Sequence, residues 1–535
     1  MTHKKDPARP GNRRLNIAGF ARDEDGSMIL FSLYLFMAIL LIGGISVDIM
    51  RNEFSRLGLQ NTVDTAVLAA ADLDQRLDPT AVVEDYFDKA GLRDHLNSTT
   101  VVENINSRTV TADSSVDVST LFMHTLGISS MPARAFGTAH EEISDIEISM
   151  VLDISGSMGS DGRLPRMKNA ARSFVNTVLS DERTAGAAGE VSLSIVPYST
   201  QVNVGSGIAE QLTLDYTHDY SHCVDLQDGD YDHTELPQEV RNQTGHFDPW
   251  TRTSPISKPV CRNDAPFIVQ PVTENRNALL AQIDALDPDG NTSTEIGAKW
   301  GAALLDPSFR PVTQGLVDAG KVDPTFDNRP FDYNHPNSMK VLVLMTDGAN
   351  TTQYELRDEF SGGLSDVWGY QDSRGRWRFS VDHPENGWED GDWTANERWY
   401  LPASDSWNNT RDGGDANTKQ LTYPELWASA STQYNAYYMW YRQNNNSQVY
   451  YDWYYAPYRT ISARTKDNRL VEICNAAKAN GILIFTVAFE ITDEDARLMK
   501  QCASSPNHYF DVEGDEIIYA FSAIASTINQ LRLIQ

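Results

Sequence analysis

The sequence predicts an α/β fold with a doubly wound, mainly parallel sheet and two long inserts, preceded by one transmembrane helix and a small α+β region. Three observations support this prediction. From residue 145 to 535, apolar segments of strand length alternate with segments of helical periodicity, as in a parallel sheet covered on both faces. Two polar segments, at about 203–270 and 351–466, interrupt the alternation. A stretch of 20 uncharged residues, 28–47, precedes it.

Composition narrows the class of protein. The chain has 535 residues, which is enough for two or more domains with cores of their own. Its formal net charge is −30, and an acidic surface of that size repels phosphate backbones, so nucleic acid is not an expected partner. Four cysteines are present, and no two stand in a CxxC pair, which argues against a zinc site and a dithiol redox motif.

Residues 28–47, MILFSLYLFMAILLIGGISV, predict the membrane helix. At 1.5 Å per residue they reach about 30 Å, the thickness of one hydrocarbon core. Asp48 and Arg51 follow where a signal peptide would have a small-residue cleavage site; a buried soluble helix is the alternative. The preceding tail, 1–27, is basic, Pro- and Gly-containing and predicted to be disordered. Positive charge before the helix predicts a cytoplasmic N-terminus and an exported remainder.

The membrane helix is expected to continue outward through residues 51–73. Apolar residues recur there on one face at helical spacing: Leu59, Val63, Ala66 and Ala70. A small mixed region follows, within the predicted domain 48–144. Alternating residues at 100–119 predict a hairpin, and 132–142 predicts a further strand.

The third predicted domain, 145–535, contains the strand and helix alternation. Strands are predicted at 146–155, 190–199, 339–346, 482–490 and 508–512. Helices are predicted at 163–180, 273–286, 470–481, 493–502 and from Ile517 onward. Ligands of such sheets bind beyond the carboxyl ends of the strands, so the loops that follow the strands are the places to search for a site.

Oxygen-bearing side chains gather in three of these loops. The strand IEISMVLDIS runs into Asp153, Ser155 and Ser157; Thr292 lies in GNTSTEIG; and Asp347 follows the strand 341–346. Carboxylates and hydroxyls form an all-oxygen set, which suits a hard cation such as Mg²⁺ or Mn²⁺. Two formal negative charges leave the ion electrophilic, so a carboxylate from a partner is expected to complete its shell.

DISGSM, the threonine of GNTSTEIG and LMTDG together resemble the metal-ion-dependent adhesion site (MIDAS) of von Willebrand factor type A domains, a Rossmann-like fold. The resemblance implies that Ser155, Ser157 and Thr292 bind the metal directly and that Asp153 and Asp347 act mainly through water. It implies Mg²⁺, or Mn²⁺ or Ca²⁺, and binding in place of catalysis. Thr294 is a rival for the threonine role, although the spacing to Gly297 favours Thr292. A degenerate domain that binds no metal is the alternative.

The N-terminal region carries a second resemblance. DEDGSMILFSLYLFMAILLIGGISVD, then LQNTVDTAVLAAA, and the C-terminal CASSPNHYFDVEGDE resemble TadG-like proteins of bacterial tight-adherence (Flp) pilus systems. This implies a single-pass protein of the bacterial inner membrane, with a periplasmic or surface-facing C-terminal domain and pilus or secretion machinery as partner. Related pseudopilins are cut after a glycine and have glutamate at the fifth position beyond it. Phe31 stands there after Gly26, so we expect an uncleaved anchor.

The cysteines are disulfide candidates, because the exported side of a membrane is oxidising. Cys474 and Cys502 flank a helix–strand–helix unit, and a bond between Cys223 and Cys261 would staple the first insert. Four cysteines allow three connectivities, and the sequence does not choose among them.

The second insert is rich in Trp and Tyr, as in YYMWYRQNNNSQVYYDWYYAPY. Three explanations are open: a small core of its own, a protein interface, or a carbohydrate-binding surface.

Three functions remain after the motif search. The first is a membrane-anchored factor of pilus assembly or tight adherence that binds a protein partner through the metal. The second is a surface adhesin that binds matrix or glycan through the aromatic insert. The third, a hydrolase using the ion as a Lewis acid, is disfavoured, because the sequence has no GxSxG elbow, Walker loop, GxGxxG or zinc triad. We expect no enzyme activity.

Overall fold

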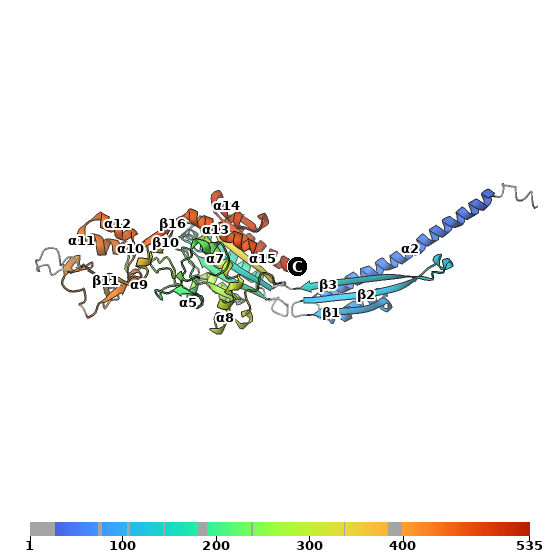
Figure 1. Cartoon of the computed structure of the whole chain (residues 1–535), viewed down its shortest axis with the longest axis horizontal. Helices are drawn as coiled ribbons and strands as arrows, with labels where there is room; N and C mark the ends of the chain where they lie inside the picture. The colour runs from blue at the N-terminus through green and yellow to red at the C-terminus, as the bar shows by residue number, and fades with distance from the viewer. Residues whose placement is uncertain are drawn as a thin grey trace, which may run out of the picture. The chain divides into compact units, whose positions relative to one another are not determined.

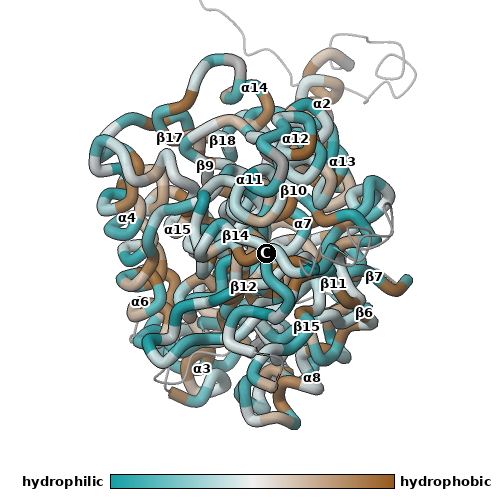
Figure 2. The backbone as a smooth tube through the Cα atoms, turned by 90° about the vertical axis from the view of Figure 1, so that its left-hand side faces the viewer, coloured by the Kyte–Doolittle hydropathy of each residue, from teal (hydrophilic) through white to brown (hydrophobic). Residues whose placement is uncertain are grey.

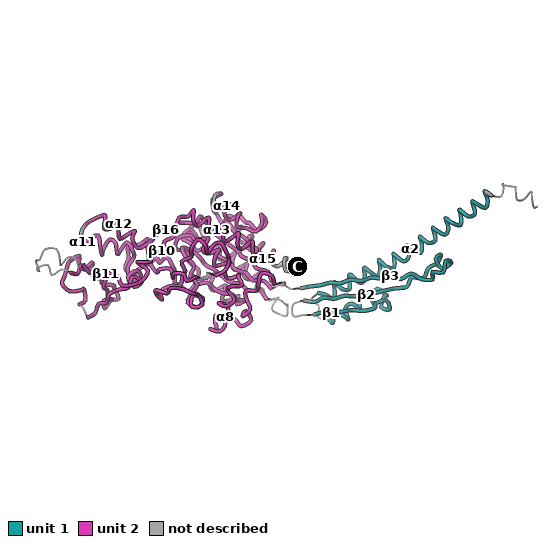
Figure 3. Tube along the Cα trace, in the orientation of Figure 1, with its two compact units in different colours: residues 1–142 teal, residues 143–535 magenta. Residues whose placement is uncertain are grey.

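A computed structural model describes residues 27–72, 77–103, 107–142, 145–179, 190–236, 239–335, 338–383, 398–414 and 416–534. The chain divides into two compact units, residues 1–142 and 143–535, which Figure 3 colours separately. Residues 1–26 of the predicted basic tail lie outside the described residues.

One long helix dominates the first unit. Helix α2, Ser27–Ala71, is continuous over 45 residues, which confirms that the apolar segment and the amphipathic segment form one helix. Its N-terminal part is long and apolar enough to cross a membrane, with a mean hydropathy of 2.5, and its apolar side chains are exposed. One face of its C-terminal part is buried. This face contains the four residues that the spacing predicted: Leu59, Val63, Ala66 and Ala70.

A three-stranded antiparallel sheet packs against this face. Strand β2, Ser107–Ser119, lies between β1, Leu96–Glu103, and β3, Ser130–Glu142, which confirms the predicted hairpin and the added strand. Helix α3, Pro79–Lys89, completes the core with Val83 and Phe87. Figure 3 shows the hairpin of β2 and β3 running alongside α2.

The second unit is built on a six-stranded sheet in the order β18-β17-β9-β4-β5-β8. Its strands are β4, Asp145–Asp153; β5, Val191–Tyr198; β8, Gln270–Thr273; β9, Ser338–Thr346; β17, Leu483–Phe489; and β18, Tyr509–Val512. Five of them pair in parallel, and the short edge strand β8 pairs antiparallel with β5. The predicted strands are present, and β8 was not predicted.

Helices pack on both faces of this sheet. One face packs on α4, Arg163–Val178; α6, Arg276–Ala285; and α15, Glu516–Ile534. The other packs on α7, Thr294–Ala303; α8, Arg310–Asp318; α13, Ala463–Ala479; and α14, Asp493–Cys502. In Figure 2 hydrophobic and hydrophilic segments alternate along α4 and α6, as expected for helices with one buried face.

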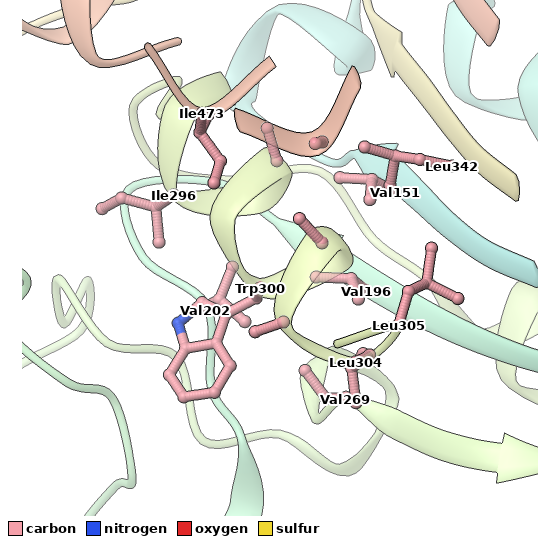
Figure 4. Close-up of a cluster of buried hydrophobic side chains, with 14 of the residues drawn as sticks. Val151, Val196, Val202, Val269, Ile296, Trp300, Leu304, Leu305, Leu342 and Ile473 are labelled. Atoms are coloured by element: carbon pink, nitrogen blue, oxygen red, sulfur yellow. The ribbon is translucent and has the colours of Figure 1, made fainter. Parts of the chain in front are cut away.

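Helix α7 lies close to the sheet because glycines face it. A Cβ atom at Gly297 would lie 2.7 Å from the ring of Tyr198, and one at Gly301 would lie 2.5 Å from Val151. Trp300 of the same helix is buried. Figure 4 shows its side chain in the cluster formed with Val151, Val196, Ile296 and Leu342. This close packing fixes the start of α7, and with it the loop that carries Thr292.

The first insert is mostly irregular. It contains a short helix, α5, Gly205–Ala209, and a two-stranded ladder of β6, Leu214–Asp215, and β7, Arg241–Asn242. A disulfide between Cys223 and Cys261 closes it.

The second insert forms a sheet of its own. Its strand order is β14-β13-β12-β11-β15, from β11, Leu364–Gln371; β12, Trp377–Asp382; β13, Trp399–Leu401; β14, Ser406–Asn408; and β15, Lys419–Thr422. Helices α9, Tyr423–Ser429, and α12, Ser447–Tyr455, follow. The antiparallel pair of β10, Gln353–Leu356, and β16, Tyr458–Ile461, lies between this part and α13 (Figure 1). Buried aromatic residues of the second insert, among them Phe379, Tyr400 and Trp427, form a core together with Phe247 and Val260 of the first insert. This is the first of the three explanations, except that the two inserts share the core.

Candidate metal centre

The site is placed by the carboxyl ends of two neighbouring strands. Strand β4 ends at Asp153 and β9 ends at Thr346, and the two strands pair in parallel with Leu152 opposite Met345. The loops that follow them therefore leave the sheet side by side, which brings Asp347 next to the loop of Asp153.

Four of the five predicted site residues lie in one chain of hydrogen bonds. The backbone N–H of Ser155 donates to Asp153 Oδ1 at 2.8 Å. The hydroxyl oxygens of Ser155 and Ser157 are 3.0 Å apart, and Ser157 Oγ donates to Asp347 Oδ1 at 2.6 Å. Two carboxylates and two hydroxyls from residues 190 positions apart thus converge at one point.

The loop of Thr292 lies beside this chain. The N–H of Gly156 donates to the carbonyl of Gly290 at 2.9 Å, which joins the two loops. Gly290 has a φ of +88°, and a Cβ atom there would lie 2.8 Å from Thr200 Oγ1, so only glycine fits. The hydrogen bonds that position Thr292 are made by its backbone, whose N–H donates to Thr351 Oγ1 at 2.9 Å. The rival, Thr294, begins α7 and has its hydroxyl 3.4 Å from the Tyr198 hydroxyl.

Lys466 is a residue of this site that the sequence interpretation missed. It lies in α13 and is fully buried, and its Nζ donates to the Thr292 carbonyl at 2.6 Å, to Ser293 Oγ at 2.7 Å and to the Thr351 carbonyl at 2.8 Å. The buried carboxylate of Glu295 lies 3.8 Å away. Burial lowers the pKa of Lys466, while the charge of Glu295 opposes that shift. The ammonium group therefore ties together two of the loops that surround the candidate site.

The carboxylates of the site are destabilised in their charged forms. Burial and the nearby Asp347 raise the pKa of Asp153 to about 6. Burial also raises the pKa of Asp347, although hydrogen bonds from Ser157 and Arg163 oppose the shift. A cation between two such carboxylates would relieve both the desolvation and the mutual repulsion.

Arg163 is a second residue that the sequence did not indicate. Its Nη1 donates to Asp347 Oδ2 at 3.1 Å, and its Nε donates to Glu490 Oε2 at 2.8 Å. The guanidinium group of Arg163 thus places a positive charge next to Asp347, the carboxylate that the resemblance assigns to the metal.

The donor set fits a hard divalent ion. Within the described part of the chain, no group of three or more His, Cys, Asp or Glu side chains is placed to hold a metal. A cation here would depend on the two carboxylates of Asp153 and Asp347 together with hydroxyls. Oxygen-only sites of this kind suit Mg²⁺, Mn²⁺ or Ca²⁺ and disfavour softer ions. This arrangement could hold such an ion with only two charged ligands. The bound ion would therefore remain electrophilic.

All four cysteines form disulfides, and the structure selects one of the three connectivities that the sequence left open. Cys223 is bonded to Cys261, with their Cα atoms 5.9 Å apart, and Cys474 to Cys502, with their Cα atoms 5.1 Å apart. The second bond joins α13 to α14, so it holds the helix that carries Lys466.

Comparison with known proteins identifies the N-terminal region. Residues 26–73 match the family model described as putative Flp pilus-assembly TadE/G-like. The predicted TadG-like N-terminus is therefore confirmed. No curated protein matches the chain.

Among solved structures, the chain is similar to the vWF domain of the type V pili tip protein Mfa5 from Porphyromonas gingivalis. The identity is 15% and the TM-score 0.32, over 74% of this chain and 97% of that one. It is also similar to the pilus adhesin RrgA from Streptococcus pneumoniae, at 13% identity and a TM-score of 0.31, over 80% of this chain and 49% of that one. The pilus adhesin SpaC from Lactobacillus rhamnosus GG is 12% identical with a TM-score of 0.30, over 81% of this chain and 34% of that one.

Proposed function

We propose that the protein is a membrane-anchored, metal-dependent binding module that acts in pilus assembly or tight adherence. The second unit, with the doubly wound architecture of a von Willebrand factor A domain, would bind a protein partner and not act as an enzyme. The observation that carries the proposal is the convergence of Asp153, Ser155, Ser157 and Asp347 in one hydrogen-bonded chain at the carboxyl ends of two parallel strands.

In this proposal Ser155, Ser157 and Thr292 hold Mg²⁺, Mn²⁺ or Ca²⁺ directly, and Asp153 and Asp347 hold it through water. When bound, the ion would supply an electrophilic centre with room for one more ligand. Hydroxyl groups donate little charge, so an anionic ligand is favoured at that position. An Asp or Glu side chain of the partner provides such a ligand.

The place of action follows from the N-terminal region. The TadE/G-like match covers the apolar part of α2, and that helix is long enough to span a bilayer. With the basic tail in the cytoplasm, the second unit lies on the exported side of the bacterial inner membrane, where pilus or secretion machinery assembles. The two disulfides are compatible with that compartment.

A calorimetric titration of the full-length protein with MgCl₂ and MnCl₂ tests the metal site. We expect one site per chain in the wild type, and no binding in the variant Ser157→Ala/Asp347→Ala. Ser160→Ala is the matched control, because Ser160 is an exposed serine of the same loop. Equal binding by the wild type and the double variant would contradict the proposal.

A surface adhesin that acts through the aromatic insert is the second candidate. One observation favours it: Tyr451 and Tyr455 of α12 are exposed, whereas other aromatic residues of the insert, such as Phe379 and Trp427, lie in its core. The rings of Tyr451 and Tyr455 are nearly parallel and line a groove with Gln448 and Asp452. Binding to matrix by the full-length protein that survives Ser157→Ala/Asp347→Ala but not Tyr451→Ala/Tyr455→Ala would favour this candidate.

A further inference from the structure

The tip of the hairpin formed by β2 and β3, residues 120–129, carries an unusual group of apolar side chains. Leu121, Phe122, Leu126 and Ile128 are exposed over 61%, 47%, 53% and 42% of their surfaces. The tip folds as a short 3-10 helix, η3, Met123–Leu126. Clustered apolar exposure of this kind marks a surface that another apolar phase covers.

The hairpin tip is fixed to α2 at the end of the apolar segment. The Asp48 carboxylate accepts hydrogen bonds from the backbone N–H groups of Leu121, Phe122 and Met123 at 2.8, 2.8 and 2.7 Å. Phe122 lies against Gly44, where a Cβ atom would come within 2.4 Å of its ring. The tip therefore sits beside the last turn of the stretch 28–47 and the turn after it.

Two polar side chains that follow the apolar segment, Asp48 and Asn52, face the hairpin. Asp48 is only 2% exposed, and its two oxygens share three donors. Asn52 Nδ2 donates to the Met131 carbonyl at 3.1 Å. Unpaired charge is costly in a bilayer, and these contacts reduce that cost at the point where the chain leaves it.

The same turns expose apolar side chains, and the charged side chains of Arg51 and Glu53 lie among them. Ile49, Met50 and Phe54 of α2 are exposed. Together with the hairpin tip, which contacts Gly44, they add apolar surface at the end of the apolar segment. Exposed charges begin at Arg51 and Glu53, about one turn beyond residue 47.

We propose that the hairpin tip is immersed in the membrane beside α2, with lipid covering Leu121, Phe122, Leu126 and Ile128. The occupant is the bilayer, because the tip lies at the depth where residues 28–47 end and because its four exposed apolar side chains adjoin the exposed apolar surface of the helix. The tip also exposes the polar side chains of His124 and Thr125, which suit the headgroup region. The tip would be a second membrane contact, which limits rotation and tilt of α2 and sets the height of the first unit above the bilayer. The inference is independent of the metal site and requires only that α2 spans the membrane.

Fluorescence quenching in vesicles tests this proposal. All four native cysteines are in disulfides, so a single introduced cysteine can be labelled selectively with the fluorophore NBD. The full-length protein carries Leu126→Cys in the tip, Phe36→Cys in the membrane helix or Phe136→Cys on β3. Phe136 is the matched control: it is 62% exposed, and its carbonyl is bound by Gln60, about 18 Å along α2 from Asp48. The vesicles contain phosphatidylcholine and phosphatidylglycerol, with a nitroxide quencher near the headgroup or deep in the acyl chain.

We expect the Leu126→Cys label to be quenched most by the shallow quencher and the Phe36→Cys label most by the deep one. The Phe136→Cys label is expected to lose less than one tenth of its fluorescence with either. The proposal is overturned if the label at position 126 is quenched no more than the one at 136 while the one at 36 is quenched. If the label at position 36 is also not quenched, α2 does not span the bilayer. That result would overturn both the proposed membrane anchor and this inference.

A second variant tests the role of Asp48 as the clamp. Asp48→Leu removes the acceptors of three N–H groups and should free the tip, so quenching at position 126 should fall at least twofold. Asp48→Asn keeps one acceptor oxygen and should give an intermediate value. Unchanged quenching in Asp48→Leu would overturn the assignment of Asp48 as the residue that holds the tip.

Discussion

Lys466 and Arg163 show how single charged residues shape the candidate site from opposite sides. Lys466 holds the loop of Thr292 from within the core, and Arg163 sits on the Asp347 carboxylate from the partly exposed side. In the proposed site, Lys466 would stabilise the loop geometry that a metal needs, and Arg163 would compete with the metal for Asp347.

Replacement of Lys466 by methionine should weaken both the fold and the site. Three buried acceptors and the Glu295 carboxylate would lose their cation, at a cost of about 3 kcal/mol in unfolding free energy. The loop of Thr292 would also lose its anchor, so Mn²⁺ should bind less tightly. Urea unfolding and Mn²⁺ titration of Lys466→Met measure the two effects. Lys168→Met removes an exposed lysine with a single backbone contact and should change neither; identical behaviour of the two variants would contradict this role.

Replacement of Arg163 by glutamine should have the opposite effect on the metal. Removal of a positive charge 3.1 Å from Asp347 Oδ2 should tighten Mn²⁺ binding, by a factor of about 2 to 5 for a charge pair near the surface. Arg166→Gln is the control, because Arg166 also lies near Glu490 but contacts Asp515 and not Asp347. Weaker binding in Arg163→Gln would show that Arg163 supports the site and does not compete with the ion.

The Asp225 carboxyl in the first insert should make stability depend on pH. Burial and then the nearby Glu355 raise its pKa to about 8, whereas Arg459 opposes the shift. In the unfolded chain an aspartate has a pKa of about 3.9. The folded state therefore binds more protons between these values, so the stability that the protonated group contributes is present at low pH and is lost as pH rises through about 8.

Urea unfolding at pH 5, 6, 7 and 8 checks this expectation. The unfolding free energy of the wild type should fall with rising pH relative to that of Asp225→Asn, which stays neutral and can still accept the hydrogen bond from Thr244. Asp358→Asn, a neighbouring exposed carboxylate, should behave as the wild type. Parallel pH profiles of the wild type and Asp225→Asn would rule out the shift.

The sequence could indicate the site residues that directly follow a strand. It could not indicate the residues that contact the site from distant parts of the chain. Asp153, Ser155 and Ser157 stand in one short motif, and Asp347 directly follows an apolar strand. Lys466 contacts the Thr292 loop across 174 residues, and Arg163 contacts Asp347 across 184. A lysine on an otherwise ordinary helix carries no local signal of such a contact.

Among the elements, those with a clear period could be predicted. The parallel strands β4, β5, β9 and β17 are buried along most of their length, and α4 and α15 keep an apolar face, so these patterns located them. The edge strand β8 has four residues and is only half-buried, which leaves too short a pattern to recognise. Three strands of the second insert, β13, β14 and β15, have only three or four residues, and the Trp and Tyr residues of the insert are compatible with strands and helices alike. The strand order depends on pairings that only the folded insert defines.

The disulfides connect elements whose positions matter for the site. In the chain-entropy model, loss of the bond between Cys474 and Cys502, or of that between Cys223 and Cys261, should cost about 3 to 4 kcal/mol. We expect Cys474→Ser/Cys502→Ser to weaken Mn²⁺ binding as well, because this bond holds α13 and hence Lys466. The pair Cys223→Ser/Cys261→Ser is the control with an equal chemical change. Thermal unfolding and Mn²⁺ titration measure both, and an equal Mn²⁺ affinity in the two variants would contradict the coupling.

At the scale of the whole molecule, the two units have separate tasks in this account. The first unit, with α2 and the hairpin tip, is the proposed membrane anchor, and the second unit carries the candidate metal site. The length and hydropathy of residues 28–47 predicted the candidate membrane helix at the start of the first unit. The contact of the hairpin tip with α2 depends on the Asp48 carboxylate, which accepts hydrogen bonds from backbone N–H groups more than 70 residues away. No sequence pattern indicates this contact.

A complementation test addresses the central claim most directly. The gene is deleted in its host and restored as wild type, as Asp153→Ala/Ser155→Ala, or as the control Ser160→Ala. Equal amounts in the cell envelope are confirmed, and surface fibres and attachment are then scored. The account predicts that the double variant fails as the deletion does, while Ser160→Ala restores both properties. Full restoration of fibres and attachment by Asp153→Ala/Ser155→Ala would contradict the claim that the protein acts through a metal held at this site.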